Sequence, residues 1–376
     1  MNMHKPLSAI ALALTVLTGC AEKAAETTTA VAPKSIDRQQ QLQGFSDDLH
    51  THIAVLASDE FEGRAPATAG EEKTVNYLAQ EFKKLGVAPG NGDSYFQQVP
   101  VVEITTNSDI SLALRGDNWS ADLAYGEGMM AFTQQQVAET GISDSQLVFA
   151  GYGIVAPEYN WNDYADIDVT GKTVVVLVND PGYGTQDENL FNGNAMTYYG
   201  RWTYKYEEAA RQGAAGVLIV HETGAAGYPW EVVSGSWSGA QISLATADKN
   251  SGRAKVEGWL SQASAEALFA GAGLNLKDAS TRALKPGFKA ETLGDIKASI
   301  KLSNKLKSSK SRNVLARIPG TTRADETIGY IVIESGNGSI NGVNYYAATS
   351  LDVVQGTGNT VTGYSLGVSG LSSAST

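Results

Sequence analysis

Apolar residues near the start of the chain recur at helical spacing. From Ser46 onward they fall three or four residues apart, at Leu49, Ile53 and Leu56, which predicts a helix. A second helix is predicted after Thr68, because Thr68 and Glu71 form the pattern of a capping box. Gly86 is expected to end this helix. Its buried face is expected to hold Val75, Leu78, Ala79, Phe82 and Leu85.

Strand patterns dominate the middle of the chain. Residues 93–104 and 109–114 alternate between polar and apolar side chains, as half-buried strands do. Residues 173–179 and 217–220 are short apolar runs, and a helical segment at 205–212 lies between them. This strand–helix–strand order predicts parallel strands and an α/β fold.

The segment between residues 180 and 204 is rich in Gly, Asn and Tyr, and it is long for an inert connection. It therefore predicts a contact with a ligand, and the candidate residues are Tyr199 and Trp202. The same aromatic side chains could instead pack against the domain that carries them.

The N-terminus has the pattern of a secretion signal. A positively charged start is followed by an apolar run too short to span a bilayer, which ends in Leu17-Thr18-Gly19-Cys20. This is the pattern of a bacterial lipobox, so residues 1–19 are predicted to be a signal peptide and Cys20 to carry lipid. Cys20 is the only cysteine, which excludes a disulfide framework. Residues 20–43 are expected to form a flexible tether.

The net charge of the chain indicates which classes of binding partner to expect. The chain has a formal net charge of −12, and removal of residues 1–19 takes away one lysine and no acidic residue, which gives −13. Nucleic-acid binding requires a basic surface, so nucleic acid is not expected as a partner. Because residue 21 is alanine, resemblance to known lipoproteins places the protein in the cell envelope, anchored to the outer membrane.

The last 43 residues, 334–376, differ in composition from the rest. They contain 8 Gly, 8 Ser and 5 Thr, with Glu334 and Asp352 as the charged residues. Asn341-Gly342 between apolar positions predicts a β-hairpin. This Gly/Ser/Thr-rich tail is expected to be a β-rich fusion, and the alternative is a reading frame broken near residue 328.

Several spaced motifs resemble one enzyme family, and together they extend from residue 45 to about residue 328. They are Leu56-Ala57-Ser58-Asp59, Phe61-Glu62-Gly63-Arg64, Ser94-Tyr95-Phe96-Gln97-Gln98-Val99, Leu147-Val148-Phe149-Ala150-Gly151-Tyr152-Gly153 and Arg312-Asn313-Val314. They resemble secreted di-zinc aminopeptidases of the MH clan, in which an inserted protease-associated (PA) domain interrupts the peptidase domain. The resemblance implies an incomplete peptidase α/β sheet interrupted by a β-rich PA-like domain.

The resemblance also implies domain boundaries and the positions at which zinc ligands are expected. It implies an N-terminal peptidase-like part at 44–110, a PA-like insertion at 111–300 and a return to the peptidase sheet at 301–333. Family members bind two zinc ions, beginning with a His-x-Asp pair that would fall near Ile333 and Ser335. Neither residue can bind zinc, and no histidine follows His221. We therefore expect no zinc on this chain and no catalytic residues.

Four other motifs are weaker candidates for a metal, cofactor or catalytic site. His50 and His52 are two residues apart on a helix and point in different directions, so an accidental site with Asp59, Glu60 and Glu62 is not expected. His221-Glu222 lacks the second histidine of H-E-x-x-H and is interpreted as structural. Gly151, Gly153 and Ala156 match a relaxed dinucleotide motif, but no helix is expected after them. Ser365 lies in a chance G-x-S-x-G, because no acid or histidine follows it.

Two functional hypotheses remain from the sequence. The first is a metallopeptidase-family lipoprotein, related to enzymes that remove peptide N-termini but inactive as this chain. The second is a binding module of the cell envelope, whose PA-like domain holds a peptide, a glycan or a protein partner.

Overall fold

The computed structural model describes residues 38–319, 327–329, 337–340 and 343–346. The chain divides into two compact units, residues 1–55 and 56–376. The described part of the first unit lies in helix α1 (Arg38–Leu56), which begins eight residues before the predicted start at Ser46. Residues 38–43 of the predicted tether are therefore helical. Arg and Gln favour helix formation without giving an apolar period, which is why the hydrophobic pattern missed this turn.

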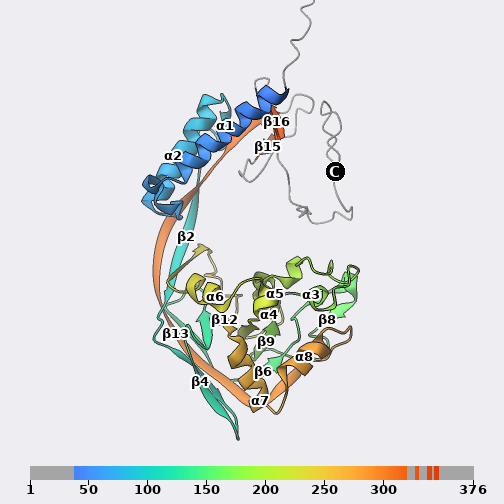
Figure 1. The fold of residues 1–376 in the computed structure, drawn as a ribbon. Coiled ribbons are helices and arrows are strands. Elements are labelled where there is room, and N and C mark those ends of the chain that lie inside the picture. The colour runs from blue at the N-terminus through green and yellow to red at the C-terminus, as the bar shows by residue number, and fades with distance from the viewer. Residues whose placement is uncertain (1–37, 320–326, 330–336, 341–342, 347–376) are drawn as a thin grey trace, which may run out of the picture. The chain divides into compact units, whose positions relative to one another are not determined.

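The second unit contains the remaining elements (Figure 1). In chain order they are η1 (Asp59–Arg64), α2 (Ala69–Lys84), β1 (Ala88–Pro89), β2 (Phe96–Thr106), β3 (Ser111–Arg115), β4 (Ser120–Ala124), β5 (Met129–Phe132), β6 (Glu139–Phe149), β7 (Val155–Ala156), η2 (Pro157–Tyr159), β8 (Trp161–Asn162), β9 (Thr173–Leu177), α3 (Pro181–Thr185), η3 (Tyr198–Gly200), α4 (Trp202–Arg211), β10 (Gly216–Val220), α5 (Thr223–Ala226), α6 (Trp230–Ser236), β11 (Ala240–Leu244), β12 (Val256–Leu260), α7 (Gln262–Gly271), α8 (Leu276–Ala283), β13 (Glu291–Val314), β14 (Ala316–Pro319), β15 (Thr327–Gly329), β16 (Asn337–Ile340) and β17 (Val343–Tyr346).

Helix α2 forms where the capping box predicts it. The Thr68 side chain accepts a hydrogen bond from the backbone N–H of Glu71, which satisfies one of the free donors of the first turn. Val75 and Phe82 are buried on its apolar face, while Leu85 is exposed because the helix ends at Lys84. Gly86 follows at φ +70°, a backbone conformation that glycine adopts without a steric penalty.

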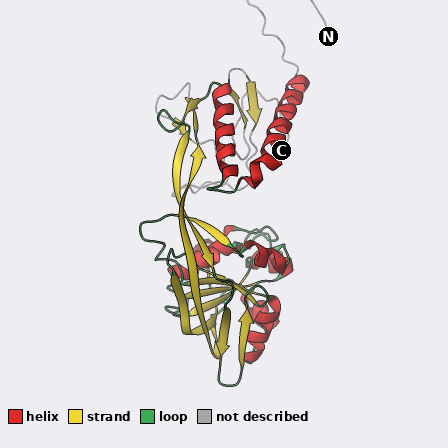
Figure 2. Cartoon of the chain, turned by 90° about the vertical axis from the view of Figure 1, so that its left-hand side faces the viewer, coloured by secondary structure: helices red, strands yellow, loops and turns green. Residues whose placement is uncertain are grey.

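A mixed sheet organises the second unit (Figure 2). Its strand order is β11-β2-β13-β6-β9-β10-β12-β5, and β3 pairs with both β13 and β4. Strands β6, β9, β10 and β12 are parallel to one another, as the strand–helix–strand pattern predicted. The α/β fold class is confirmed.

The central strands are apolar on both faces because helices cover both. Val174 and Val176 of β9 belong to one hydrophobic cluster, which includes side chains of α4, α5 and α6. Val175 and Leu177 belong to another cluster, which includes side chains of α7 and α8. This two-sided burial accounts for the uninterrupted apolar run seen in the sequence.

The longest strand, β13, crosses a predicted domain boundary. Its first part pairs with β6 up to Ser303, and its second part pairs antiparallel with β2 from Asn304 to Val314. The division predicted between residues 300 and 301 therefore lies inside one continuous strand. The segment at 111–300, predicted to be β-rich, contributes parallel strands and several helices. Polar and apolar residues continue to alternate through residue 300, so no change of pattern marks a boundary there.

A smaller sheet, of order β1-β14-β15, lies beside a cluster of Phe82, Val87 and Ala316. In the tail, β16 and β17 pair antiparallel on either side of Asn341-Gly342, which confirms the predicted hairpin. Cys20, the signal peptide, Ser365 and the rest of the tail lie outside the described residues. Within the described part of the chain, no helix has the length and hydrophobicity to cross a membrane.

Candidate functional site

A pocket of about 320 Å³ opens at the edge of the sheet where the parallel strands end. In α/β sheets this carboxyl edge is the usual place for a ligand, because the segments after neighbouring strands meet there. Each of β6, β9, β10 and β12 contributes, either by its last residue or by those just after it. The pocket is lined by Tyr152, Leu177, Val178, Tyr183, Val220, Glu222, Ala225, Gln262, Glu266, Leu276, Lys277 and Ser280.

The pocket has an apolar floor and a charged rim. Leu177, Val178 and Val220 are buried at the strand ends and form the floor. On the rim, the exposed Glu266 of α7 accepts a hydrogen bond from the Gln262 amide at 3.0 Å. Sites for small organic ligands likewise combine apolar side chains with polar groups that fix the orientation of the ligand.

Glu222 is the acidic rim residue with a fixed position. It stands at the start of α5, where its Oε1 accepts from the Gly224 N–H at 2.9 Å and its Oε2 from the Ala225 N–H at 3.0 Å. Both oxygens are held by backbone donors, and each keeps a further lone pair for another donor. The carboxylate is thus presented to the pocket without needing a ligand to order it.

Tyr152 is the most buried polar side chain of the lining, with 7% of its surface exposed. Among the described residues no hydrogen bond to its hydroxyl is found, and this oxygen is not one of the buried unpaired side-chain atoms, so it keeps some contact with solvent. Tyr152 also belongs to the lining of the pocket. Burial, followed by the charges of Asp180, Asp163 and Glu222, raises the pKa of Tyr152 far above its usual value. The phenol therefore remains protonated and can both donate and accept a hydrogen bond.

Beneath Tyr152 lies a fully buried lysine. Lys205 of α4 donates from Nζ to the Tyr152 carbonyl oxygen at 2.6 Å, and Nζ lies 5.6 Å from the centre of the Tyr152 ring. Burial lowers the pKa of Lys205 to about 7, against the opposing effect of Asp163 and Asp180. Burial likewise raises the pKa of Asp163 to about 7. The lysine ties the turn after β6 to α4 and so positions Tyr152.

The aspartates near Lys205 hold the surrounding loops. Asp163 accepts from the Ile154 N–H at 3.0 Å and from the Trp161 indole at 2.8 Å. Asp180 accepts from the Gly182 N–H at 3.1 Å and from the Thr197 hydroxyl at 2.7 Å. These bonds fix the backbone on two sides of the pocket.

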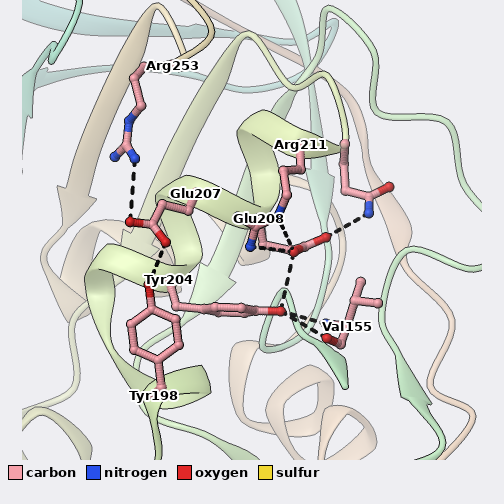
Figure 3. Close-up of polar contacts among 8 residues, drawn as sticks. Val155, Tyr198, Tyr204, Glu207, Glu208, Arg211 and Arg253 are labelled. Carbon is pink, nitrogen blue, oxygen red and sulfur yellow. Dashed lines mark hydrogen bonds and ion pairs between the residues drawn. The ribbon is translucent and has the colours of Figure 1, made fainter. Parts of the chain in front are cut away.

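A separate polar network fixes α4 (Figure 3). The Tyr198 hydroxyl donates to Glu207 at 2.5 Å, and Glu207 lies 3.8 Å from the Arg253 guanidinium. The next residue, Glu208, accepts hydrogen bonds from Arg211 and Tyr204. These contacts anchor the helix that carries Lys205.

The two aromatic residues predicted to contact a ligand lie outside the pocket. The Tyr199 hydroxyl donates to Glu158 at 2.6 Å, and its ring meets Phe191 edge-on. Trp202 packs edge-on against Trp237, with ring centres 4.9 Å apart. Both residues are half-buried in such contacts. Their surroundings match the packing alternative, and ligand contact by either remains a prediction.

The remaining candidate residues are dispersed. His50 and His52 lie on α1, whereas Asp59, Glu60 and Glu62 lie in η1 of the other unit. Within the described residues, no three His, Cys, Asp or Glu side chains are grouped so that they could hold a metal ion.

His221 is buried at the end of β10. Its Nε2 lies 3.0 Å from the Tyr228 carbonyl oxygen, and burial lowers its pKa. These contacts fit the structural role predicted for it. Gly151 and Gly153 are followed by a two-residue strand and a single 3-10 turn, not by the α-helix that a pyrophosphate site requires.

A second, more open depression of about 580 Å³ lies at the opposite edge, near the start of β6. Its buried polar residue, Ser145, is already hydrogen-bonded to Thr173 at 2.8 Å and to the Gly171 carbonyl. The hydroxyl of Ser145 therefore has partners within the protein, whereas among the described residues none is found for the hydroxyl of Tyr152.

Sequence reasoning did not identify Tyr152, Glu222, Glu266 or Lys277 as neighbours in a site. In the sequence, Tyr152 was considered as part of a glycine-rich motif and Glu222 as part of an incomplete zinc-binding motif. The usable signal was that residues following consecutive parallel strands converge at one edge. Applied to β6 and β10, that rule would have brought Tyr152 and Glu222 together.

Comparisons with known proteins give distant structural likenesses and no sequence match. No family model matches the sequence, and no curated protein matches it. Among solved structures, the chain matches BSAP, a zinc aminopeptidase from Bacillus subtilis, at 14% sequence identity with a TM-score of 0.27. The match covers 74% of this chain and 48% of that one, so the chain spans about half the length of the aminopeptidase.

Proposed function

We propose that the protein is a binding module whose ligand site is the pocket at the carboxyl ends of β6, β9, β10 and β12. The observation that supports this most directly is the composition of the lining. Buried apolar side chains are combined with a pre-positioned carboxylate, Glu222, and a largely buried tyrosine, Tyr152. The volume of about 320 Å³ suits a small molecule or one end of a peptide.

This module is proposed to act at the cell envelope, attached through lipid on Cys20. The lipobox pattern supports this location, and the acidic composition supports partners other than nucleic acid. A peptide, a glycan or an exposed chain end of a partner protein could each present a small group to the pocket.

Ligand binding can be tested by filling the pocket. Ser280 lines it from α8, and its neighbour Thr281 is exposed outside it; each hydroxyl bonds to the carbonyl four residues earlier. Ser280→Phe should therefore abolish binding, while Thr281→Phe should preserve it. Differential scanning fluorimetry of the mature chain with a panel of dipeptides, monosaccharides, and aliphatic amines, acids and alcohols provides the measurement. A ligand at about ten times its Kd stabilises by about 1.4 kcal/mol, a shift of a few degrees.

Two results would contradict the proposal. One is the absence of a thermal shift with every member of the panel. The other is a shift that persists in Ser280→Phe as strongly as in Thr281→Phe, because the ligand would then bind elsewhere.

We also propose that the chain does not hydrolyse peptides by itself, although its motifs resemble zinc aminopeptidases. Ile333 and Ser335 stand where the resemblance places the first zinc ligands, and neither side chain can coordinate zinc. After incubation with zinc and dialysis, the mature chain should retain fewer than two ions and leave aminoacyl-anilides intact. Two retained zinc ions, with hydrolysis that is lost on chelation, would overturn this proposal.

A further inference from the structure

We propose that this pocket selects a primary ammonium group carried on a short aliphatic body. The inference rests on the binding function proposed above and specifies the class of ligand. It is based on three features of the lining: the hydroxyl of a largely buried tyrosine, the sign of the surrounding charge, and the apolar floor.

The first feature is the Tyr152 hydroxyl. A buried polar side chain normally satisfies its hydrogen bonds within the protein, and Tyr204, which also lies close to Glu208, bonds to Val155. The Tyr152 hydroxyl has no such partner among the described residues. The residue as a whole is 7% exposed, its backbone carbonyl is held by Lys205, and its hydroxyl oxygen remains open to solvent. A ligand that donates a hydrogen bond to this oxygen would satisfy it.

The second feature is the charge around that oxygen. Glu222 lies in the lining, and Asp180 is close enough for both carboxylates to disfavour a phenolate at Tyr152. Glu266 adds a further acid on the rim. The basic groups nearby are Lys277, which is exposed in the lining as Glu222 and Glu266 are, and Lys205, whose amine donates to the Tyr152 carbonyl. The lining itself therefore holds two acidic residues and one basic residue. A carboxylate ligand beside Glu222 would meet like charge, whereas an ammonium would be attracted.

The third feature is the floor. Val178, Val220 and Ala225 are buried and line the pocket, and Leu276 closes one side from α8. A hydrated metal ion or an inorganic anion would leave this apolar surface in contact with water. An aliphatic chain of four or five carbons would cover it, at about 0.8 kcal/mol for each methylene group buried.

The charge preference can be measured with three compounds of nearly the same shape. Isothermal titration calorimetry at pH 7 would compare 3-methylbutylamine, 3-methylbutan-1-ol and 3-methylbutanoate on the mature chain. The amine should bind at least about tenfold more tightly than the alcohol, because a hydrogen bond to a charged group is worth more than a neutral one. The acid should be the weakest of the three.

Variants then locate the effect. Tyr152→Phe keeps the ring and should weaken amine binding by about tenfold or more, through loss of the charged hydrogen bond. Tyr95→Phe removes a hydroxyl that donates to the Val87 carbonyl, away from the pocket and from α4, and should leave the affinity unchanged. Glu222→Gln should weaken binding of the amine and leave binding of the alcohol unchanged. This variant provides an independent test if Tyr152→Phe does not fold.

The possible failures are distinguishable. If alcohol or acid binds as tightly as the amine, and Ser280→Phe abolishes that binding, the pocket binds ligands and the ammonium inference is wrong. If amine binding survives in both Tyr152→Phe and Glu222→Gln, these groups do not select it and the inference is also wrong. If none of the three compounds binds while another panel member does, only the ligand class is refuted. If nothing binds, the binding function fails as well.

Discussion

Replacing Glu257 by glutamine should change how the stability of the protein depends on pH. Glu257 lies in β12 with none of its surface exposed. Its Oε1 accepts from the Arg253 Nε at 3.0 Å, whereas its Oε2 is buried with no hydrogen-bond partner. Burial raises its pKa from 4.5 to about 7, in spite of the opposing charge of Arg253. The folded state therefore holds this proton more tightly than the unfolded state does.

The sign and size of the effect follow from that difference. Between pH 4.5 and about 7 the folded state binds more protons, so the contribution of Glu257 to stability is present below pH 4.5 and is lost as pH rises through 7. The interval is about 2.5 pH units at about 1.4 kcal/mol each, which gives about 3 kcal/mol. Glutamine does not titrate, so Glu257→Gln should lack this loss. The free energy of unfolding of the variant minus that of the wild type should rise by about 3 kcal/mol from pH 4 to pH 8.

Urea denaturation followed by circular dichroism at several pH values would measure this difference. Asp163 and Lys205 titrate in both proteins, so their contributions cancel. Arg253→Gln is a directional control: it removes the cation that lowers the Glu257 pKa, so the loss of stability should extend to higher pH. A wild-type-to-variant difference that stays constant within about 0.5 kcal/mol across this range would refute the reasoning.

Two further predictions concern buried positions. Burial lowers the pKa of Lys205 from 10.5 to about 7, so between these pH values the folded state binds fewer protons than the unfolded state, and stability should rise with pH. Lys205→Met should abolish this rise, as measured by urea denaturation at pH 7 and pH 10. An unchanged rise in the variant would contradict the assignment to Lys205. A Cβ on Gly141 would overlap the backbone carbonyl of Ile300 in β13, so Gly141→Ala should lower the free energy of unfolding by about 1–3 kcal/mol, as measured by thermal denaturation. Gly252 has open space around it, so Gly252→Ala should change this free energy by no more than about 0.5 kcal/mol. Equal stability of the two variants would show that the strands shift to accommodate the added methyl group.

The sequence carried enough information to predict the central elements of the fold. Strand β9 was recognisable because helices cover both of its faces, which requires the unbroken apolar run at residues 173–177. Helix α2 was recognisable from Thr68 and Glu71, since capping is a local interaction. The 24-residue length of β13 was not predicted. Its two halves pair with different strands, and no local property of residues near 300 distinguishes one half from the other.

The candidate site could not be read from the sequence in the same way. Its lining comes from several elements, and the place of Tyr152 in that lining, at the carboxyl edge of the sheet, depends on the fold. The aromatic segment with Tyr199 and Trp202 drew attention by composition, which does not distinguish packing from contact with a ligand. Lys205 had no signal, because a lysine on a predicted helix is ordinarily exposed.

The partnership of β2 with β13 has a consequence for how the chain folds during synthesis. Thr106 and Asn304 bond across 198 residues, and Glu71 bonds to Ser311 across 240. At roughly 5–20 residues per second, a ribosome needs about 10–50 s to make the intervening chain. Until then β2 lacks its β13 neighbour and presents open backbone groups, a state prone to association with other chains. Such non-local pairing also slows folding. Refolding yield should therefore fall as protein concentration rises, and holdase chaperones should benefit the nascent chain most before residue 314 is made.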